Sequence, residues 1–493
     1  MRSILETCQP RNDLLTGAFN PEIFTAVLSQ VLEYYRGNTN ITQNIYTDAE
    51  AFFTEATYPT QGMKSVLTDV FGRLAGDNSL PAIHRLETAF GGGKTHTLIA
   101  CTHLGFRGRE LAQITGTILD PALLPSPGEV VVVGVAGDEV PVHKPRGKAL
   151  IPYTLWGEIA FQIGGKKLYS EVEEEVTSHA APGRTYFERV LGGRKVLIML
   201  DELAQYATRL EAAREHGAEQ LAAFLMDLHG YARSHAGIAV VLTLASQKDA
   251  FATQTRLLTE LLANVRGTEV AEDEVVALRE KAEKDLQSVV ARDASPVTPV
   301  QAAEISRVLA KRLFMSIDAS AALETAKAYT EMYARNATLL PDEATRADFE
   351  DKLVAHYPFH PTLIDFLNKK LATIETFHGT RGVLRVLAVT VRNIWKDELA
   401  VPMVQTCHLN LRDARIVGEV LGRTGSSDLL PVLNADIGGV DTEQLEGDVA
   451  TQNWRTCIIR IHRAIRCTNG AGERCSSTVW LAVTQDSSRN YLV

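Results

Sequence analysis

A run of three glycines followed by Lys94 and Thr95 has the residue types needed to hold a polyphosphate. Glycine lacks a Cβ atom, so its backbone can approach an anion closely and adopt positive φ angles. The positive end of a helix that follows the run would add to the attraction. In this interpretation the Lys94 ammonium contacts the β and γ phosphates, and the Thr95 hydroxyl is a ligand of Mg²⁺.

The residues around this run are those of a phosphate-binding loop, with one departure. An apolar segment at residues 81–86 precedes the run and a helical pattern at residues 95–104 follows it, which is the required order of strand, turn and helix. In the usual spacing G-x-x-x-x-G-K-[ST] the first glycine would stand at position 88, which is Thr88 in this chain. The alternative is a glycine-rich turn that carries a surface lysine.

Two carboxylates, Asp201 and Glu202, end an unbroken apolar run at residues 196–200. Such a run is typical of a strand that is buried on both faces of a parallel sheet. Asp201 at the carboxyl end of this strand would bind Mg²⁺ through water, and Glu202 would polarise the attacking water as a general base. The alternative is a core strand that meets a solvated turn.

Gln247 follows a further apolar segment at residues 237–245. At the end of a strand its amide would orient the attacking water or contact the γ phosphate, and the alternative is a plain strand-end amide. Arg385 lies near the start of the helical pattern at residues 380–387. From a small helical domain after the core, this arginine could reach a γ phosphate and couple its loss to movement of the domain. The alternative is a surface salt bridge.

His356 and His360 have the spacing of a metal-binding pair on one helix. Pro358 and Pro361 interrupt the helix that such ligation needs, so no metal site is predicted there.

Composition limits the class of protein. The 493 residues predict about two to four domains, and 45% apolar with 22% charged residues is ordinary for a soluble globular chain. A net charge of -10 argues against a generally basic nucleic-acid-binding surface but leaves room for a local basic groove. The six cysteines form no close C-x-x-C pair, and no signal core or membrane-length apolar run is present. We therefore expect a cytoplasmic protein without a membrane partner.

Strands alternate with helices in the middle of the chain, which predicts an α/β fold with a doubly wound parallel sheet. The segment at residues 293–299 contains Ser-Pro and Thr-Pro and is interpreted as a linker. The charged helix expected at residues 271–292 is interpreted as a solvated helix. The predicted domains are an N-terminal helical cap (1–79), the core (80–292), a helical lid (293–400), the start of a further domain (401–449) and an atypical tail (450–493). The alternatives for the tail are a small, poorly packed segment and a non-native or truncated coding sequence.

Residues 86–99, with the run Phe-Gly-Gly-Gly-Lys-Thr-His, resemble domain-of-unknown-function family 499. Residues 200–206, 357–361 and 380–385 are similar to the same family, and the resemblance covers about residues 1–449. It is a family of AAA+-like P-loop ATPases found in prokaryotic phage-defence islands, and its members are longer, so the chain resembles their N-terminal part. The tail departs from the family pattern.

The resemblance implies roles for individual residues. Asp201 and Glu202 would be the metal-binding and catalytic acids, Gln247 a sensor in the core, and Arg385 a sensor on the lid. AAA+ proteins usually work as rings, and Arg266 is our choice for the arginine that completes a neighbouring subunit's site, with Arg256 as the second choice. Nucleotide contacts would come from Phe90, Gly91, Gly92, Gly93, Lys94, Thr95 and His96.

The resulting hypothesis is an ATPase that uses ATP and Mg²⁺ and remodels or moves a partner. The partner would be DNA or a DNA-modification or nuclease complex in phage defence, and the protein would form a homo-oligomer. One alternative is a nucleotide-gated scaffold with little turnover. The other is a DNA-binding assembly protein, against which the acidic net charge counts.

Overall fold

The computed structural model describes residues 1–20, 25–87, 93–147, 150–244, 272–371, 379–425 and 427–431. The chain forms two compact units. We call Ile23–Gln301 the sheet unit, and Met1–Glu22 together with Ala302–Val493 the helical unit. This division differs from the predicted one, because the first residues of the chain belong with its second half and the predicted cap of residues 1–79 is split. The predicted tail, residues 450–493, lies outside the described residues.

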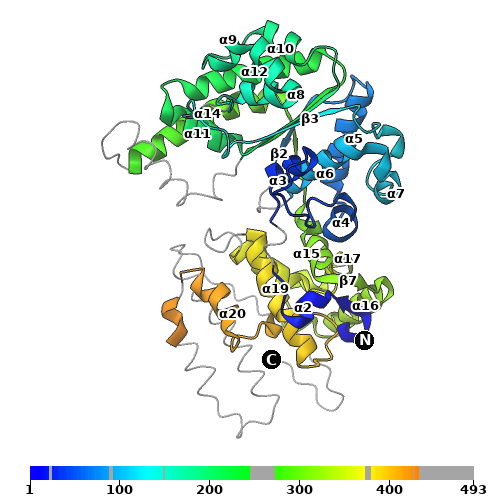
Figure 1. Ribbon diagram of the computed structural model, residues 1–493. Coiled ribbons are helices and arrows are strands. Elements are labelled where there is room, and N and C mark those ends of the chain that lie inside the picture. Colours follow the sequence, from blue (N-terminus) through cyan, green and yellow to red (C-terminus); the bar gives the residue numbers. More distant parts are fainter. Residues whose placement is uncertain are drawn as a thin grey trace. The chain divides into compact units, whose positions relative to one another are not determined.

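A five-stranded parallel sheet forms the centre of the sheet unit (Figure 1). Its order is β3-β4-β5-β2-β6, so β5 lies between the strand before the glycine run and the strand that ends in Asp201. Both β4 and β5 are buried along their whole length, as their continuous apolar sequences predict. The strands are β2 (Ile83–Leu86), β3 (Val131–Ala136), β4 (Val196–Asp201), β5 (Ile238–Thr243) and β6 (Ser295–Val297).

The predicted linker at residues 293–299 is wrong, because Ser295–Val297 is β6 and pairs with β2. Pro296 has no N–H group to donate, which a strand tolerates at the edge of a sheet. The Ser-Pro and Thr-Pro pairs therefore mark an edge strand and its exit.

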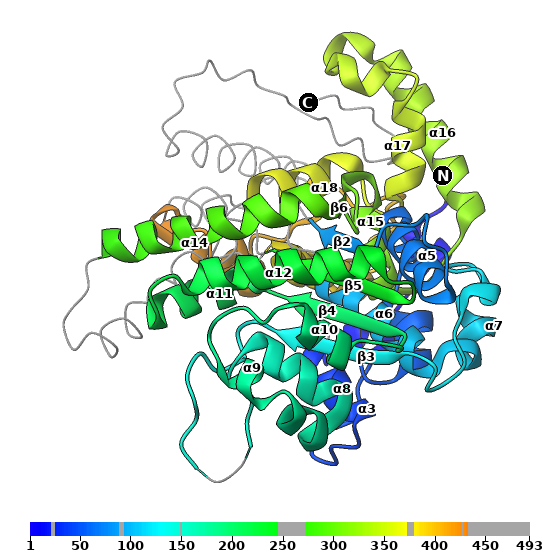
Figure 2. The same ribbon diagram turned by 90° about the horizontal axis from the view of Figure 1, so that it is seen from above.

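Helices cover both faces of this sheet, as Figure 2 shows from a second direction. One hydrophobic core joins the sheet to helices including α3, α5 and α6, and the other joins it to helices including α8, α10, α11, α12 and α14. The helices of the unit are α3 (Leu28–Tyr35), α4 (Ala49–Ala51), α5 (Gln61–Ala75), α6 (Lys94–Arg107), α7 (Ala112–Thr115), α8 (Leu155–Glu171), α9 (Glu173–Thr177), α10 (Arg184–Val190), α11 (Leu203–Ala213), α12 (Gly217–Ser234) and α14 (Glu272–Asp293).

Helix α14 is more than the solvated helix that its charge density predicts. It packs against α11 and α12 and buries Ala282 and Leu286 in the core. Lys281 of α14 forms an ion pair with Glu211 of α11, with 2.9 Å between Nζ and Oε1. The charged residues thus share the helix with a buried apolar stripe.

The helical unit contains the helices expected between residues 300 and 396. Its main helices are α15 (Ile305–Leu313), α16 (Ala319–Arg335), α17 (Phe349–His356), α18 (Pro361–Phe366), α19 (Gly379–Lys396) and α20 (Ala414–Val417). Helix α15 ends at Leu313, because β7 (Phe314–Ile317) pairs antiparallel with β1 (Cys8–Pro10). Two further short helices, α1 (Ile4–Thr7) and α2 (Asn12–Thr16), flank β1.

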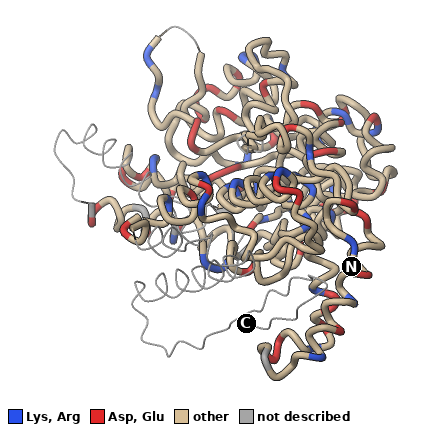
Figure 3. Tube along the Cα trace, turned by 90° about the horizontal axis from the view of Figure 1, so that it is seen from below, with Lys and Arg blue, Asp and Glu red and all other residues tan. Residues whose placement is uncertain are grey.

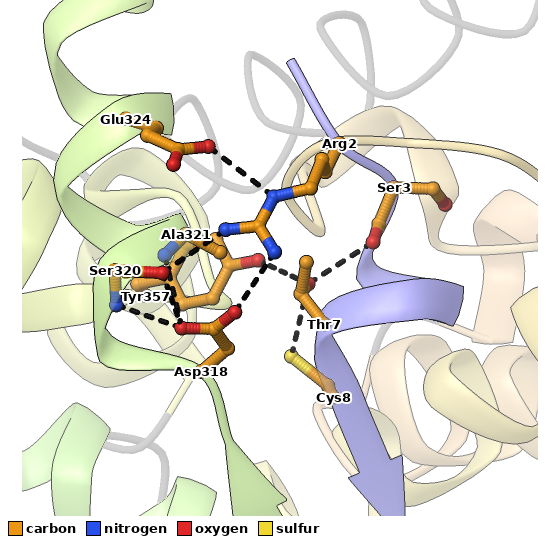
Figure 4. A network of polar contacts seen from close by, with 9 residues as sticks. All are labelled: Arg2, Ser3, Thr7, Cys8, Asp318, Ser320, Ala321, Glu324 and Tyr357. Atoms are coloured by element: carbon orange, nitrogen blue, oxygen red, sulfur yellow. Dashed lines mark hydrogen bonds and ion pairs between the residues drawn. The ribbon is translucent and has the colours of Figure 1, made fainter.

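Within the helical unit, side-chain bonds join the N-terminal segment to the part of the unit that begins at Ala302 (Figure 4). Arg2 forms ion pairs with Asp318 at 2.9 Å and with Glu324 at 3.2 Å. The Thr7 hydroxyl lies 2.6 Å from the Tyr357 hydroxyl. Burial raises the pKa of the neighbouring Cys8 thiol to about 11, so this cysteine is a packing residue rather than a nucleophile.

Within the described ranges, every helix is too short or too polar to cross a membrane.

Candidate functional site

The carboxyl ends of β2, β5 and β4 meet at one edge of the sheet and bring the predicted residues together. Gly93 begins α6 with a φ of +93°, a left-handed conformation that favours glycine. A Cβ atom at this position would lie 2.7 Å from a methyl group of Val300. Lys94 follows in the first turn of α6, and its Nζ donates to the carbonyl oxygen of Leu244, just after β5, at 3.2 Å.

A chain of hydrogen bonds crosses the three strand ends. The Thr95 hydroxyl donates to Asp201 Oδ2 at 3.0 Å, and the Thr243 hydroxyl donates to Asp201 Oδ1 at 2.5 Å. Thr243 Oγ1 also accepts from the Glu202 backbone N–H at 2.9 Å. Thr243 therefore orients both the side chain of Asp201 and the backbone of Glu202.

Burial and hydrogen bonding have opposite effects on the pKa of the Asp201 carboxyl. Only 5% of the residue is exposed, and this burial raises the pKa of the carboxyl. The hydrogen bonds from Thr243 and Thr95 and the positive charge of Lys94 act in the opposite direction, since they stabilise the ionised form. A cation bound beside Asp201 would favour ionisation further.

Glu202 has a strained backbone. Its φ of +53° and ψ of +40° lie in the left-handed region, which costs a non-glycine residue roughly 1 kcal/mol or more. This conformation turns the chain from β4 directly into α11. The residue is fixed from the other side by Gly137, whose N–H donates to the Asp201 carbonyl at 2.8 Å. A Cβ at Gly137 would lie 2.6 Å from the Glu202 carbonyl oxygen, so the two segments are closely packed.

The donor set suits a hard divalent cation that keeps part of its water. Thr95 and Asp201 present a hydroxyl and a carboxylate oxygen to the same place. Mg²⁺ is usually held by one or two carboxylates together with water and substrate phosphates. In the described part of the chain, no group of three or more His, Cys, Asp or Glu side chains could hold an ion by protein ligands alone. The residues present therefore fit a magnesium ion that arrives with a phosphate.

His96, predicted from the family pattern as a nucleotide contact, lies elsewhere. Its Nε2 is 2.9 Å from the Thr57 hydroxyl, and its ring lies 4.5 Å from that of Phe52, centroid to centroid. Successive side chains on a helix point in different directions, so Thr95 contacts Asp201 while His96 packs into the core. The predicted nucleotide contact of His96 stays a prediction.

Several other predicted residues lie outside the described ranges. They are Phe90, Gly91 and Gly92 of the glycine run, and Gln247, Arg256 and Arg266 after β5.

Arg385, the predicted lid sensor, lies on α19 in the helical unit. Its Nε is 2.9 Å from Glu419 Oε2, and each side chain is 15% exposed. This is an ion pair within the unit, and the predicted role at a γ phosphate stays a prediction.

The two histidines of the rejected metal pair are both engaged. His356 Nδ1 is 2.8 Å from the Lys352 carbonyl, and His360 Nε2 is 2.8 Å from the Tyr333 hydroxyl. Burial lowers the pKa of His360 to about 3, so this ring is neutral at physiological pH.

Thr243 is the site residue that sequence reasoning missed. It stands inside the apolar run at residues 237–245, where a β-branched residue is expected for its strand propensity alone. The signal that could have found it is a hydroxyl at the carboxyl end of a strand in a parallel sheet, where ligands bind.

Comparison with protein-family models gives two matches. The model of the DUF499 N-terminal domain matches residues 9–116 and 128–266. The model of the DUF499 second domain matches residues 301–460, and its start falls beside the boundary between the sheet unit and the second part of the helical unit. A search of curated proteins finds no match.

Proposed function

The chain belongs to the DUF499 family, and from this premise we propose that its sheet unit binds a nucleoside triphosphate with Mg²⁺ and hydrolyses it. The observation that carries the proposal is the hydrogen-bonded chain Thr95–Asp201–Thr243–Glu202 beside Lys94. Asp201 and Thr243 end two neighbouring strands, and Lys94 and Thr95 lie in the first turn of α6. Their chemistry, with that of Glu202, is what phosphoryl transfer to water requires.

Binding would rest on charge and on the first turn of α6. Lys94 now donates to the neutral carbonyl of Leu244, and a phosphate oxygen is a stronger acceptor for an ammonium group. The positive end of the 14-residue helix α6 begins at the same point. Both features favour a polyphosphate at the glycine run.

Thr95 and Asp201 would hold the metal ion, since they are the hydroxyl and carboxylate that meet at the strand ends. When bound, Mg²⁺ neutralises negative charge on the phosphate oxygens.

Glu202 is the group that would accept a proton from the attacking water. It follows Asp201 directly, and unlike Asp201 the residue is only partly buried. The bond from its N–H to Thr243 and the close contact with Gly137 fix the backbone from which its side chain extends. A general base is effective when it is held in this way.

The sheet order supports a P-loop NTPase fold of the AAA+ type as the finer description. The strand before the glycine run and the acidic strand flank β5, so all three strands contribute to one site. A ring-shaped homo-oligomer, remodelling of a DNA or protein partner, a role in phage defence and a cytoplasmic location are further parts of the proposal, and they rest on the family resemblance.

Replacing Lys94 with alanine should weaken nucleotide binding at least about 30-fold, because the polyphosphate loses a charged partner at a partly desolvated site. Titration of a fluorescent ATP analogue measures the affinity, and steady-state phosphate release from Mg-ATP measures turnover. Lys167→Ala, which removes an exposed lysine of α8, is the matched control and should behave as wild type. Unchanged binding in Lys94→Ala would refute the proposed loop. Binding by wild type that depends on Lys94 but brings no turnover would favour the scaffold alternative.

Replacing Thr243 with valine should lower turnover about tenfold at neutral pH, since one buried hydrogen bond to an ionised group is lost. The Thr243 hydroxyl lowers the pKa of Asp201, so its removal raises that pKa further. The carboxylate must be ionised to bind a cation. As the pH is lowered, phosphate release by the valine variant should therefore be lost at a higher pH than phosphate release by wild type. Thr243→Ser keeps the hydroxyl and should restore the wild-type pH profile of phosphate release. Equal profiles for the valine and serine variants would contradict the assignment.

A further inference from the structure

A basic loop lies between β3 and α8 on the sheet unit and projects from it (Figure 2). The connection begins with two exposed acidic residues, Asp138 and Glu139, after which residues 140–151 contain three Lys or Arg residues and no Asp or Glu. The chain as a whole has a net charge of -10. We use the name basic loop for its described and exposed part, residues 143–147. His143, Lys144 and Arg146 are exposed there, and blue segments mark the lysine and arginine positions along the projecting loop in Figure 3.

The base of this loop is fixed, although its tip is exposed. Val140 and Val142 are buried in the hydrophobic core below it. Two arginines, one on α11 and one directly after it, donate to carbonyl groups at its base. Arg209 donates to Asp138 at 2.7 Å and Arg214 to Val142 at 3.4 Å. The backbone at the base of the loop is therefore held in place by the core and by these hydrogen bonds.

The charged groups at the tip have no partner in the described part of the chain. No hydrogen bond or ion pair of His143, Lys144 or Arg146 is found among the described residues, whereas many other lysines and arginines of the sheet unit are paired. Unpaired cations on a proline- and glycine-containing loop form an anion-binding surface rather than a stabilising contact. Like charges held close together also repel one another, so a bound polyanion would relieve an unfavourable arrangement.

The loop connects to the candidate site through two short routes. Gly137, which begins the connection from β3 to the basic loop, donates to the Asp201 carbonyl and packs against the Glu202 carbonyl. Of the two arginines that hold its base, Arg209 lies on α11, which begins directly after Glu202, and Arg214 directly follows the end of that helix. A ligand on the loop would thus contact an element that is continuous with the proposed catalytic residue.

We propose that the basic loop binds the phosphate backbone of nucleic acid. The proposal goes beyond the proposed ATPase and does not require it, because residues 143–147 contribute none of the groups proposed to bind or hydrolyse ATP. Lysine and arginine contacts to phosphates supply the sequence-independent part of nucleic-acid affinity. Residues 143–147 offer no Phe, Tyr, Trp or branched aliphatic side chain, which a protein interface would use as an anchor. The nearest exposed aliphatic residue is Ile151, which is 46% exposed.

The test compares two charge reversals of equal size. Binding of a fluorescein-labelled DNA duplex of mixed sequence is followed by anisotropy over a series of KCl concentrations. The double variant Lys144→Glu/Arg146→Glu should weaken binding at least about tenfold and reduce the slope of log affinity against log salt by about 2, one for each lost phosphate contact. The control Lys166→Glu/Lys167→Glu changes two exposed lysines later in α8 and should bind as wild type. Equal melting temperatures of both variants exclude unfolding as the cause.

Several outcomes would overturn the proposal. It fails if wild type shows no saturable DNA binding, or if both double variants lose affinity equally. An acidic protein partner would instead be indicated if poly-glutamate competes as well as DNA and Ile151→Ser also weakens capture of the polymer. Under the nucleic-acid proposal, Ile151→Ser leaves DNA affinity unchanged.

A consequence of the loop's contacts rests on the proposed function. If the sheet unit hydrolyses ATP, duplex DNA should raise phosphate release by wild type, and this stimulation should vanish in Lys144→Glu/Arg146→Glu. Lys94→Ala separates the two proposals, because it should lose turnover while its DNA affinity stays at the wild-type value. DNA binding without any turnover would contradict only the ATPase, and turnover without DNA binding would contradict only the loop assignment.

Discussion

Replacing Glu202 with glutamine should abolish most phosphate release while nucleotide binding stays at the wild-type affinity. Glutamine keeps the size of the side chain and can still accept a hydrogen bond, but it cannot take up a proton from water. Loss of a general base typically lowers the rate about 10²- to 10⁴-fold. Because the Glu202 backbone is held by Thr243 and Gly137, the substitution leaves the fold of the strand end intact. Single-turnover phosphate release with saturating Mg-ATP measures the chemical step directly.

The control for this experiment is Glu174→Gln, which removes the charge of an exposed glutamate on α9. It should release phosphate at the wild-type rate. A Glu202→Gln protein that also hydrolyses at the wild-type rate would show that another group activates the water. Reduced nucleotide binding in Glu202→Gln would instead indicate that the residue contributes to the ground state, since a pure base affects only the transition state.

The sequence could predict those parts of the fold that depend on long apolar patterns. The strands β4 and β5 and the helices α5, α12, α16 and α19 follow from such patterns, because burial on one or both sides leaves a clear periodicity. The edge strand β6 and the pair of β1 with β7 have no such signal. They are three or four residues long and are stabilised by partners that are distant in the sequence, so local propensity does not reveal them.

The division into units was equally hidden from the sequence. The N-terminal segment joins the helical unit through Arg2, Thr7 and β1, and each of these pairs with a residue more than 300 positions away. Such contacts carry no local pattern. A polar N-terminal segment with a short helix is therefore equally consistent with a cap on the domain that follows it and with a part of the helical unit.

The candidate site was predictable where one motif supplies both chemistry and position. The glycine run places Lys94 and Thr95 in the first turn of α6, and the end of β4 fixes Asp201. Thr243 was missed, although a hydroxyl at the carboxyl end of a strand is a signal, because its contact with Asp201 depends on β5 lying beside β4.

Arg73 is a buried arginine at the amino ends of β2 and β5, which is the end of the sheet opposite to the candidate site. It is 2% exposed on α5, and its guanidinium donates to backbone carbonyls rather than to a carboxylate. The shortest bond runs from Nη2 to the Ala232 carbonyl at 2.8 Å, near the end of α12. Five further bonds of 3.0 to 3.4 Å reach carbonyls in three segments, at Asn78, Leu80, Arg233, His235 and Ile238. Burial lowers the pKa of the guanidinium, but arginine stays charged at any pH of interest.

This single cation joins the end of α5, the end of α12 and the starts of β2 and β5. The last carbonyls of a helix have no partner inside the helix, and the negative end of its dipole attracts a positive charge. Arg73 donates to a carbonyl near the end of α12 and places a positive charge there. It also donates to the Leu80 carbonyl in the turn that leads into β2. Its five N–H groups match this task, and a lysine, with three N–H groups on one atom, could not reach the same set of acceptors.

Replacing Arg73 with methionine should therefore destabilise the sheet unit by about 3 to 5 kcal/mol, because the apolar side chain fills the space but leaves buried carbonyls without donors. Arg73→Lys should recover only part of this loss. Hydrogen exchange is the appropriate measurement, since a chain with two units need not unfold in one step. Amides of β2 and β5 should exchange faster in Arg73→Met, while those of α16 in the helical unit stay protected. Arg184→Met, at an arginine whose side chain is 79% exposed on α10, should change neither set. If Arg73→Met exchanges like this control, the carbonyls are satisfied by water, and the buried guanidinium is not what holds these four elements together.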